Sequence, residues 1–205
     1  MAGIKKKDLE IKLQEIPDHP DPDPGLEQYP TPADIAADIL FRAYIDRNIK
    51  GKKVADLGCG TGIFALGASY LGASSVRAID SDQESIKIAE EKAKDWSVSE
   101  NIHFEVGEVT GFQARVDTVL MNPPFGSQKK GADIPFLEKA FEISDTVYTI
   151  HNAVTVEFLE NFIKERGHNL FWEKRYKFEV DKLFEFHRKE KESFDVVSFG
   201  IKIKR

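Results

Sequence analysis

The segment from Lys53 to Leu71 restricts the fold of this chain more than any other part of its sequence. Lys53–Leu57 (K-V-A-D-L) predicts a buried strand, residues 58–62 (G-C-G-T-G) predict a tight turn, and Ile63–Leu71 predicts a helix. These three elements in this order form the ligand-binding corner of a doubly wound sheet, because residues without side chains let a ligand approach the backbone. The glycines alternate as D-x-G-x-G-x-G, unlike the G-x-G-x-x-G of dinucleotide sites. The segment therefore predicts an α/β fold.

Asp56 and Asp80 end the first two predicted strands. The Asp56 carboxylate is an acceptor that can orient the glycine turn, and it would repel a pyrophosphate, which indicates a ligand without phosphates. Asp80 follows the strand Ser75–Ile79 and lies 24 positions after Asp56. This is close to the spacing of about 20 residues at which an acid binds ribose hydroxyls in doubly wound folds. Because residue 81 or 82 (S-D) can cap the next helix, Asp80 remains available for a ribose.

Glu108 follows a third predicted strand, Ile102–Val106, and one glycine. Its carboxylate can accept a hydrogen bond from an adenine amine, or it can be a solvated turn residue. Spacing does not distinguish these two roles.

The stretch Val116–Gly126 (V-D-T-V-L-M-N-P-P-F-G) joins a predicted strand to an abrupt stop. Pro123 and Pro124 remove two backbone donors and hold Asn122 out of the helical region at the end of the strand. The Asn122 carboxamide oxygen and the Pro123 carbonyl are acceptors, and Phe125 offers a flat apolar face. Together they suit a planar ring that carries an exocyclic NH2 group. The alternative is a Pro-Pro turn that only ends a strand.

Other periodic segments predict further helices and strands. Residues 17–25 are proline-rich and predict an extended linker. Helices are predicted at Lys5–Ile16, Ala33–Arg47, Gln83–Trp96, Ile134–Ile143 and near Val154–Arg166, a strand at Thr146–Ile150, and an antiparallel pair at Asn169–Val180 and Phe194–Ile203.

Several polar and aromatic residues beside these elements are candidates for function. Thr31 is expected to be the N-cap of the helix that begins at residue 33; capping does not explain Gln28 and Tyr29, which are candidate pocket residues. His151 is expected to pack or cap, with a role at the edge of a pocket as the alternative. Residues 127–133 (S-Q-K-K-G-A-D) suit either nucleic-acid contacts or a solvated loop. Residues 184–189 (F-E-F-H-R-K) suit nucleic-acid contacts, and the alternative is that their two phenylalanines belong to the core.

Composition limits the classes of protein that this chain can represent. Its 205 residues with 41% hydrophobic content suffice for one well-buried domain. A net charge of -6 argues against binding to nucleic acid through bulk charge and leaves only local basic patches. The absence of a long apolar run or a signal-peptide core predicts a cytoplasmic protein. The single cysteine, Cys59, fits a reducing compartment and, with five scattered histidines, argues against a structural zinc site.

Taken in order, D-L-G-C-G-T-G at residues 56–62, the acids at 80 and 108, and N-P-P-F at 122–125 resemble the class I S-adenosylmethionine-dependent methyltransferases that modify exocyclic amines. L-E-Q-Y-P-T-P at residues 26–32, M-N-P-P-F-G at 121–126 and F-H-R-K-E-K-E-S-F-D at 186–195 narrow the resemblance. They are similar to the methyltransferase-like protein five family, the adenine-N6 methyltransferases of small-subunit ribosomal RNA, and to its archaeal relatives. The resemblance covers roughly the whole chain.

The resemblance implies a Rossmann-like seven-stranded sheet, mostly parallel with an antiparallel last strand. It implies S-adenosylmethionine as cofactor, structured RNA as substrate and a small zinc-ribbon activator of the Trm112 type as partner. Residues 33–205 are expected to form the methyltransferase domain, with residues 1–32 packed on it. The residues expected to receive the target adenine are Asn122, Pro123, Pro124 and Phe125. The resemblance assigns the cofactor to Gln28, Thr31, Gly58, Thr61, Ile63, Asp80 and Glu108, and the pocket reasoning adds Tyr29, Asp56, Gly60 and Asn122.

Other functions fit the same residues. N-P-P-[FY] also serves methylation of guanine N2, of DNA adenine or cytosine and of protein glutamine, and fold alone does not separate these. A module that binds the cofactor without chemistry, or a purely structural platform, are the non-enzyme alternatives. Every enzyme hypothesis requires the glycine turn and Asn122 to open onto one shared cavity, so that a methyl donor faces an amine.

Overall fold

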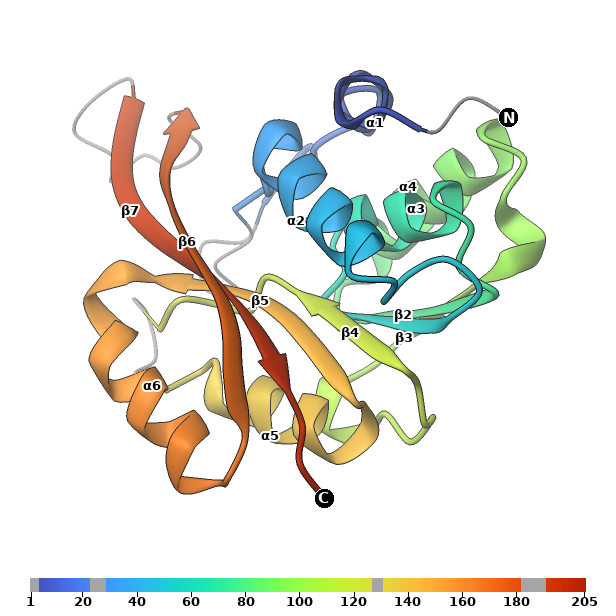
Figure 1. Cartoon of the computed structure of the whole chain (residues 1–205). Helices are drawn as coiled ribbons and strands as arrows, with labels where there is room; N and C mark the ends of the chain where they lie inside the picture. Colours follow the sequence, from blue (N-terminus) through green and yellow to red (C-terminus); the bar gives the residue numbers. More distant parts are fainter. Residues whose placement is uncertain (1–3, 23–28, 127–130, 182–190) are drawn as a thin grey trace.

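A computed structural model describes residues 4–22, 29–126, 131–181 and 191–205 of the chain. Their seven strands form one sheet in the order β3-β2-β1-β4-β5-β7-β6 (Figure 1). Strands β1 to β5 are parallel, whereas β7 is antiparallel to both β5 and β6. The predicted fold class is confirmed. The strands are β1 Lys53–Leu57, β2 Ser75–Asp80, β3 Ile102–Val106, β4 Thr118–Met121, β5 Thr146–Asn152, β6 Asn169–Asp181 and β7 Lys191–Lys202.

Helices cover both faces of the sheet (Figure 1). One face carries α1 Lys6–Leu13, α2 Ala33–Ile45, α3 Ile63–Tyr70 and α4 Gln83–Asp95; the other carries α5 Ile134–Ile143 and α6 Val156–Glu165. Short 3-10 turns lie at Ser99–Asn101, Val109–Gly111 and Ala153–Thr155. Among the described residues, no helix is both long and apolar enough to cross a membrane.

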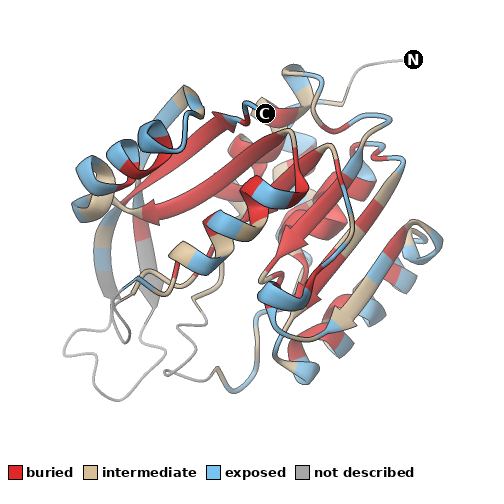
Figure 2. Ribbon diagram, turned by 90° about the horizontal axis from the view of Figure 1, so that it is seen from below, coloured by how far each residue is buried: buried red, intermediate tan, exposed pale blue. Residues whose placement is uncertain are grey.

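The central strands are buried because helices cover both faces of a parallel sheet. Every residue of β4 is buried, and Figure 2 shows buried residues along the strands and on the inner sides of the helices. The strand pairing also aligns the carboxyl ends: Leu57 lies opposite both Ile79 in β2 and Met121 in β4. Consequently the residues that follow each strand leave the sheet side by side. The strand order reverses between β1 and β4, and doubly wound folds bind ligands at such a point.

Most predicted elements are confirmed, with ends that differ by one to three residues. One local prediction was wrong. The N-cap of α2 is Pro32, which makes no side-chain capping bond, so Thr31 is not the cap of this helix. The predicted helix near Val154–Arg166 is divided into a 3-10 turn and α6. Residues 184–189 and the lysines at 129 and 130 lie outside the described residues.

The N-terminal helix α1 is part of the core of the fold. Leu9 and Leu13 are completely or almost completely buried in the same apolar cluster as α2 and α3. Asp38 of α2 links this helix to α1 and to β6, because it accepts hydrogen bonds from Lys6 of α1 and from Lys174 and Tyr176 of β6. Residue 32 as the boundary of the methyltransferase domain remains a prediction.

Asp38→Asn is expected to lower the free energy of unfolding at neutral pH by about 1 kcal/mol, since exposed partners are screened. Partial burial opposes ionisation, yet the bonds from Lys174, Lys6 and Tyr176 lower the pKa of Asp38 to about 2. The unfolded chain has the ordinary, higher pKa, so this contribution is present above about pH 4 and is lost as the pH falls towards 2. Urea unfolding of wild type and Asp38→Asn, at neutral pH and at about pH 2, measures the effect, and hydrogen exchange shows whether α1 is affected. Equal stability of wild type and Asp38→Asn at neutral pH would contradict the prediction.

Candidate active site

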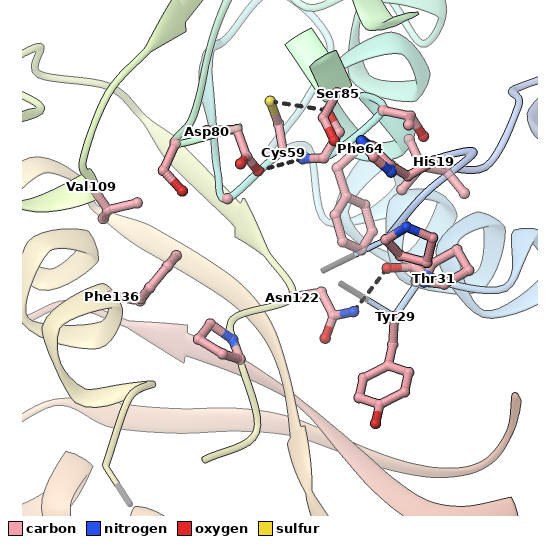
Figure 3. Close-up of a pocket in the computed structure, with 18 of the residues that line it drawn as sticks. His19, Tyr29, Thr31, Cys59, Phe64, Asp80, Ser85, Val109, Asn122 and Phe136 are labelled. Carbon is pink, nitrogen blue, oxygen red and sulfur yellow. Dashed lines mark hydrogen bonds between the residues drawn. The ribbon is translucent and has the colours of Figure 1, made fainter. Parts of the chain in front are cut away.

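A cavity of about 490 Å³ opens at the carboxyl ends of β1, β2 and β4 (Figure 3). Its volume lies within the range of cofactor sites. Glycines of the turn after β1 and Asn122 after β4 both line it, so the expected shared cavity is confirmed. In Figure 3, Val109 and Phe136 lie on one side of the space and His19, Tyr29 and Thr31 on the other, with Asn122 between them. The predicted site residues that line the cavity are Tyr29, Thr31, Gly58, Gly60, Thr61, Ile63, Asp80, Glu108, Asn122 and Pro124.

The glycine turn needs its glycines for conformation and for space. Gly58 has φ +70° and Gly60 has φ +51°, values that other residues rarely adopt. A Cβ atom on Gly58 would lie 2.9 Å from the Phe136 ring, which forms another part of the cavity wall. A side chain at position 58 would therefore displace Phe136 and narrow the cavity.

Asp80 joins the second strand to the glycine turn. Its Oδ2 accepts from the Gly60 amide at 2.7 Å, and its Oδ1 accepts from the Asp82 amide at 2.9 Å. Asp82 caps α4 by accepting from the amides of Glu84 and Ser85, as the sequence indicated. Burial raises the pKa of Asp80, although the backbone bonds oppose this shift. Asp80 thus holds the turn in shape, and its carboxylate lines the cavity where a ribose is expected.

Asp56 lies behind the turn and does not line the cavity. Its Oδ2 accepts from the Ala65 amide in α3 at 2.8 Å, and its Oδ1 is buried without a partner among the described residues. The carboxyl group therefore anchors the first turn of α3. Direct contact between Asp56 and a cofactor, the sequence-based expectation, is not supported by this position.

Asp56→Asn is expected to flatten the pH dependence of stability. Burial raises the pKa of Asp56 to about 8. Between its ordinary value and about 8, the folded protein holds a proton that the unfolded chain has released, so the free energy of unfolding falls as pH rises, by about 1.4 kcal/mol per pH unit. The variant stays neutral and loses this part of the slope. Urea unfolding of wild type and Asp56→Asn at about pH 5.5 and about pH 7.5 tests this. An identical change of the free energy of unfolding with pH in the two proteins would contradict the prediction.

Asn122 presents one end of its carboxamide to the protein and leaves the other end unpaired. Its Nδ2 donates to the Thr31 hydroxyl at 3.0 Å. Its Oδ1 is buried and has no hydrogen-bond partner among the described residues. A buried acceptor without a partner is costly, at about 1–3 kcal/mol, and such an atom in a cavity points to a donor on a ligand.

The remaining residues of the N-P-P-F motif are placed differently. Pro124 lines the cavity, whereas Pro123 is buried and does not line it. Phe125 contacts Phe178 of β6 and Phe194 of β7 edge-on, with ring centroids 6.0 Å and 5.6 Å apart. Phe125 therefore packs against the β6–β7 pair and lies outside the cavity lining. Its contact with a substrate ring remains a prediction.

Sequence reasoning missed one wall of the cavity. The proline-rich segment was interpreted as a linker, yet Ile16, Asp18, His19 and Pro22 line the cavity. His19 Nε2 lies 2.9 Å from Asp82 Oδ2 at the start of α4. The available signal was position, since this segment directly precedes the L-E-Q-Y-P-T-P motif.

Two other predicted positions have clear outcomes. His151 is buried, lies within hydrogen-bonding distance of Thr149 and Asp133, and does not line the cavity, so the packing interpretation is confirmed. Gln28 lies outside the described residues.

The charges around the cavity select the kind of ligand. The described lining residues include the carboxylates Asp18, Asp80 and Glu108 but no lysine or arginine. Such a lining disfavours phosphates and favours a neutral or cationic ligand. Apolar surface from Ile63 and Phe136 completes the wall. A sulfonium-bearing nucleoside combines a positive charge, ribose hydroxyls and a flat base, so the residues present fit S-adenosylmethionine.

The strand order and the site at its reversal point place the protein among the class I methyltransferases. Residues 31–144 match the family model described as the methyltransferase small domain. The rRNA N(6)-adenosine-methyltransferase Mettl5 of Drosophila melanogaster is 30% identical over 96% of this chain and 95% of its own length. The chain therefore belongs to the methyltransferase small-domain family and, within it, to the Mettl5 family.

Archaeal proteins give stronger similarity along the whole chain. The protein MJ0284 of Methanocaldococcus jannaschii is 40% identical over 97% of this chain and 94% of its own length. The crystal structure of PH1948 from Pyrococcus horikoshii has a TM-score of 0.91 and 41% identity, and the match covers 99% of this chain and 100% of that one. The similarity includes the N-terminal helix and the antiparallel strands, which lie outside the family model.

Proposed function

We propose that this protein transfers a methyl group from S-adenosylmethionine to the N6 amine of an adenine in ribosomal RNA, with small-subunit RNA as the expected substrate. One observation carries the proposal: the buried Asn122 Oδ1 lacks a partner and belongs to a residue that lines the same cavity as the glycine turn. An exocyclic NH2 group is a donor that would satisfy this oxygen. The name of the Drosophila relative supports adenine in ribosomal RNA as the acceptor.

The cofactor would be held by residues of three strand ends. Asp80 would accept from the ribose hydroxyls, and Glu108 with Val109 would contact the adenine. The turn at residues 58–62 and Thr31 would contact the methionine part. All of them line the cavity except Gly62, which holds the end of the turn in a left-handed conformation. Bound in this way, S-adenosylmethionine would supply an electrophilic methyl carbon on a sulfonium.

The protein contributes orientation and exclusion of water to the transfer. Asn122 Oδ1 would accept an N6 hydrogen and so direct the nitrogen lone pair at the methyl group. The N–C bond would form as the S–C bond breaks, and the amine would become acidic only then. Its proton can therefore leave to solvent, and no strong base is required near Asn122. Phe125, three residues after Asn122, is proposed to stack on the target base.

Methyl transfer to separate acceptors tests the proposal. The protein is incubated with labelled S-adenosylmethionine and, in turn, small-subunit RNA, large-subunit RNA, DNA or ribosomal protein. Nucleoside mass spectrometry then identifies the product. N6-methyladenosine in small-subunit RNA supports the proposal; label only in guanine, in DNA or in protein glutamine would assign the same site to another amine. No transfer, and no binding of S-adenosylhomocysteine, would exclude the enzyme hypothesis.

A Trm112-type zinc-ribbon activator is proposed from the family resemblance, and a cytoplasmic location from the sequence. Co-expression of the chain with such a protein, followed by size-exclusion chromatography, tests the partner. A stable complex with higher turnover than the chain alone is the expected result. Separate elution and unchanged turnover would contradict it.

A further inference from the structure

The contact between Thr31 and Asn122 joins two segments that prolines hold rigid. Thr31 lies between Pro30 and Pro32, and Asn122 directly precedes Pro123. A residue before proline is confined to extended backbone, and a threonine side chain is restricted at its first torsion because it is β-branched. The backbone of both partners is therefore restricted before a substrate arrives. Their sequence separation of 91 positions makes this a contact that only the fold creates.

The orientation of the Asn122 carboxamide matters because its two ends have opposite chemistry. Oδ1 accepts a hydrogen bond and Nδ2 donates, and a half-turn of the terminal torsion, which is broad and nearly two-fold, exchanges them. An NH2 group turned towards the substrate amine would place two donors face to face. The Nδ2 to Thr31 Oγ1 bond of 3.0 Å leaves Oδ1 as the end without a protein partner among the described residues.

We propose that Thr31 is a positioning residue, whose hydroxyl accepts from Asn122 Nδ2 and thereby keeps Oδ1 facing the substrate amine. This inference rests on the proposed amine-methylating function and gives Thr31 a role besides the cofactor contact that the family resemblance implies. Thr31 lies one residue before the N-cap Pro32 and makes no capping bond to α2, and its hydroxyl accepts from Asn122 instead.

Two substitutions separate this role from packing. Thr31→Val removes the hydroxyl and keeps the shape of the side chain, whereas Thr31→Ser keeps the hydroxyl. Thr31→Val is expected to lower kcat for methyl transfer about tenfold, the effect of losing one hydrogen bond, with little change in the KM for RNA. Thr31→Ser is expected to restore most of kcat. Equal activity of Thr31→Val and wild type, or equal loss in both variants, would overturn the proposal.

Binding and spectroscopy give readouts that do not depend on turnover. The Asn122 side-chain amide signals are assigned in nitrogen-15 NMR spectra by their absence in Asn122→Ala. In wild type and Thr31→Ser, these protons should exchange slowly with water; in Thr31→Val they should exchange faster and shift. Unchanged signals in Thr31→Val would overturn the inference even if activity fell.

Calorimetry with S-adenosylhomocysteine completes the test. Thr31→Val is expected to raise the dissociation constant by up to about tenfold through the lost cofactor contact, and the fall in kcat measured at saturating cofactor then reports the orientation of Asn122. A large loss of affinity with unchanged amide signals would make Thr31 a cofactor contact only and overturn the inference. If wild type methylates no RNA, the proposed function fails, while the amide signals still report whether Thr31 orients Asn122.

Discussion

Asn122→Ala is expected to lower turnover by about a hundredfold to a thousandfold, the range seen when one pre-organised polar group is removed from an active site. The substitution removes the Oδ1 that is buried and unpaired beside the cavity, so the amine loses the acceptor that orients it. The affinity for S-adenosylhomocysteine should remain nearly unchanged, because the turn at residues 58–62 and Asp80 are untouched. Single-turnover methyl transfer and calorimetry on the same preparation measure both quantities.

Asn152→Ala is the matched control. Asn152 is the last residue of β5, the strand beside β4, and its side chain caps the following turn by accepting from the Val154 amide. It does not line the cavity. A small loss of stability with normal turnover is expected. Normal turnover in Asn122→Ala itself would refute the role of this asparagine.

Asp80→Ala is expected to weaken S-adenosylhomocysteine binding by about a hundredfold, which corresponds to about 2.7 kcal/mol. The change removes the acceptor for ribose hydroxyls. It also releases the Gly60 amide, which Asp80 Oδ2 holds at 2.7 Å, so the glycine turn loses its fixed shape. Hydrogen bonds to charged groups contribute about 1.5–3 kcal/mol each, which supports a loss of this size. Calorimetric titration measures it directly.

Asp117→Ala provides a carboxylate control at the amino ends of the central strands, opposite the cavity. Asp117 Oδ2 accepts from the Lys53 amide at 2.8 Å, at the amino end of β1. This is the same kind of bond as that from Gly60 to Asp80, but it lies far along the strand from the cavity. Asp117→Ala should lower stability and leave cofactor affinity unchanged. Equal affinity losses in both variants would show that Asp80 acts only through general stability.

Local sequence patterns predicted the architecture well. The strand Lys53–Leu57 and the helix Ile134–Ile143 have the predicted bounds. Apolar periodicity fixes which residues are buried, and glycine or proline fixes where an element ends. The same reasoning identified Asp80 and Asn122, because an acid or amide directly after a buried parallel strand lies at the carboxyl end of the sheet, where ligands bind.

Local patterns predicted the wrong partner where a side chain could form hydrogen bonds with more than one group. Thr31 fits an N-cap, but its hydroxyl accepts from Asn122. Asp56 precedes the glycine turn, but its carboxylate turns back to the Ala65 amide and is buried behind the cavity. The direction of each side chain depends on its partner, and the Asn122 partner of Thr31 lies 91 positions away in the sequence.

The sequence by itself determined the order of elements, the class of fold and the two strand ends that carry the site, because burial and backbone freedom are properties of short segments. The tertiary structure decided which distant groups meet. It placed His19 on the cavity wall, paired Thr31 with Asn122 across 91 positions and left Asn122 Oδ1 unpaired. Such pairings follow from strand register and from helix packing, which bring residues together through the whole core rather than through neighbouring residues.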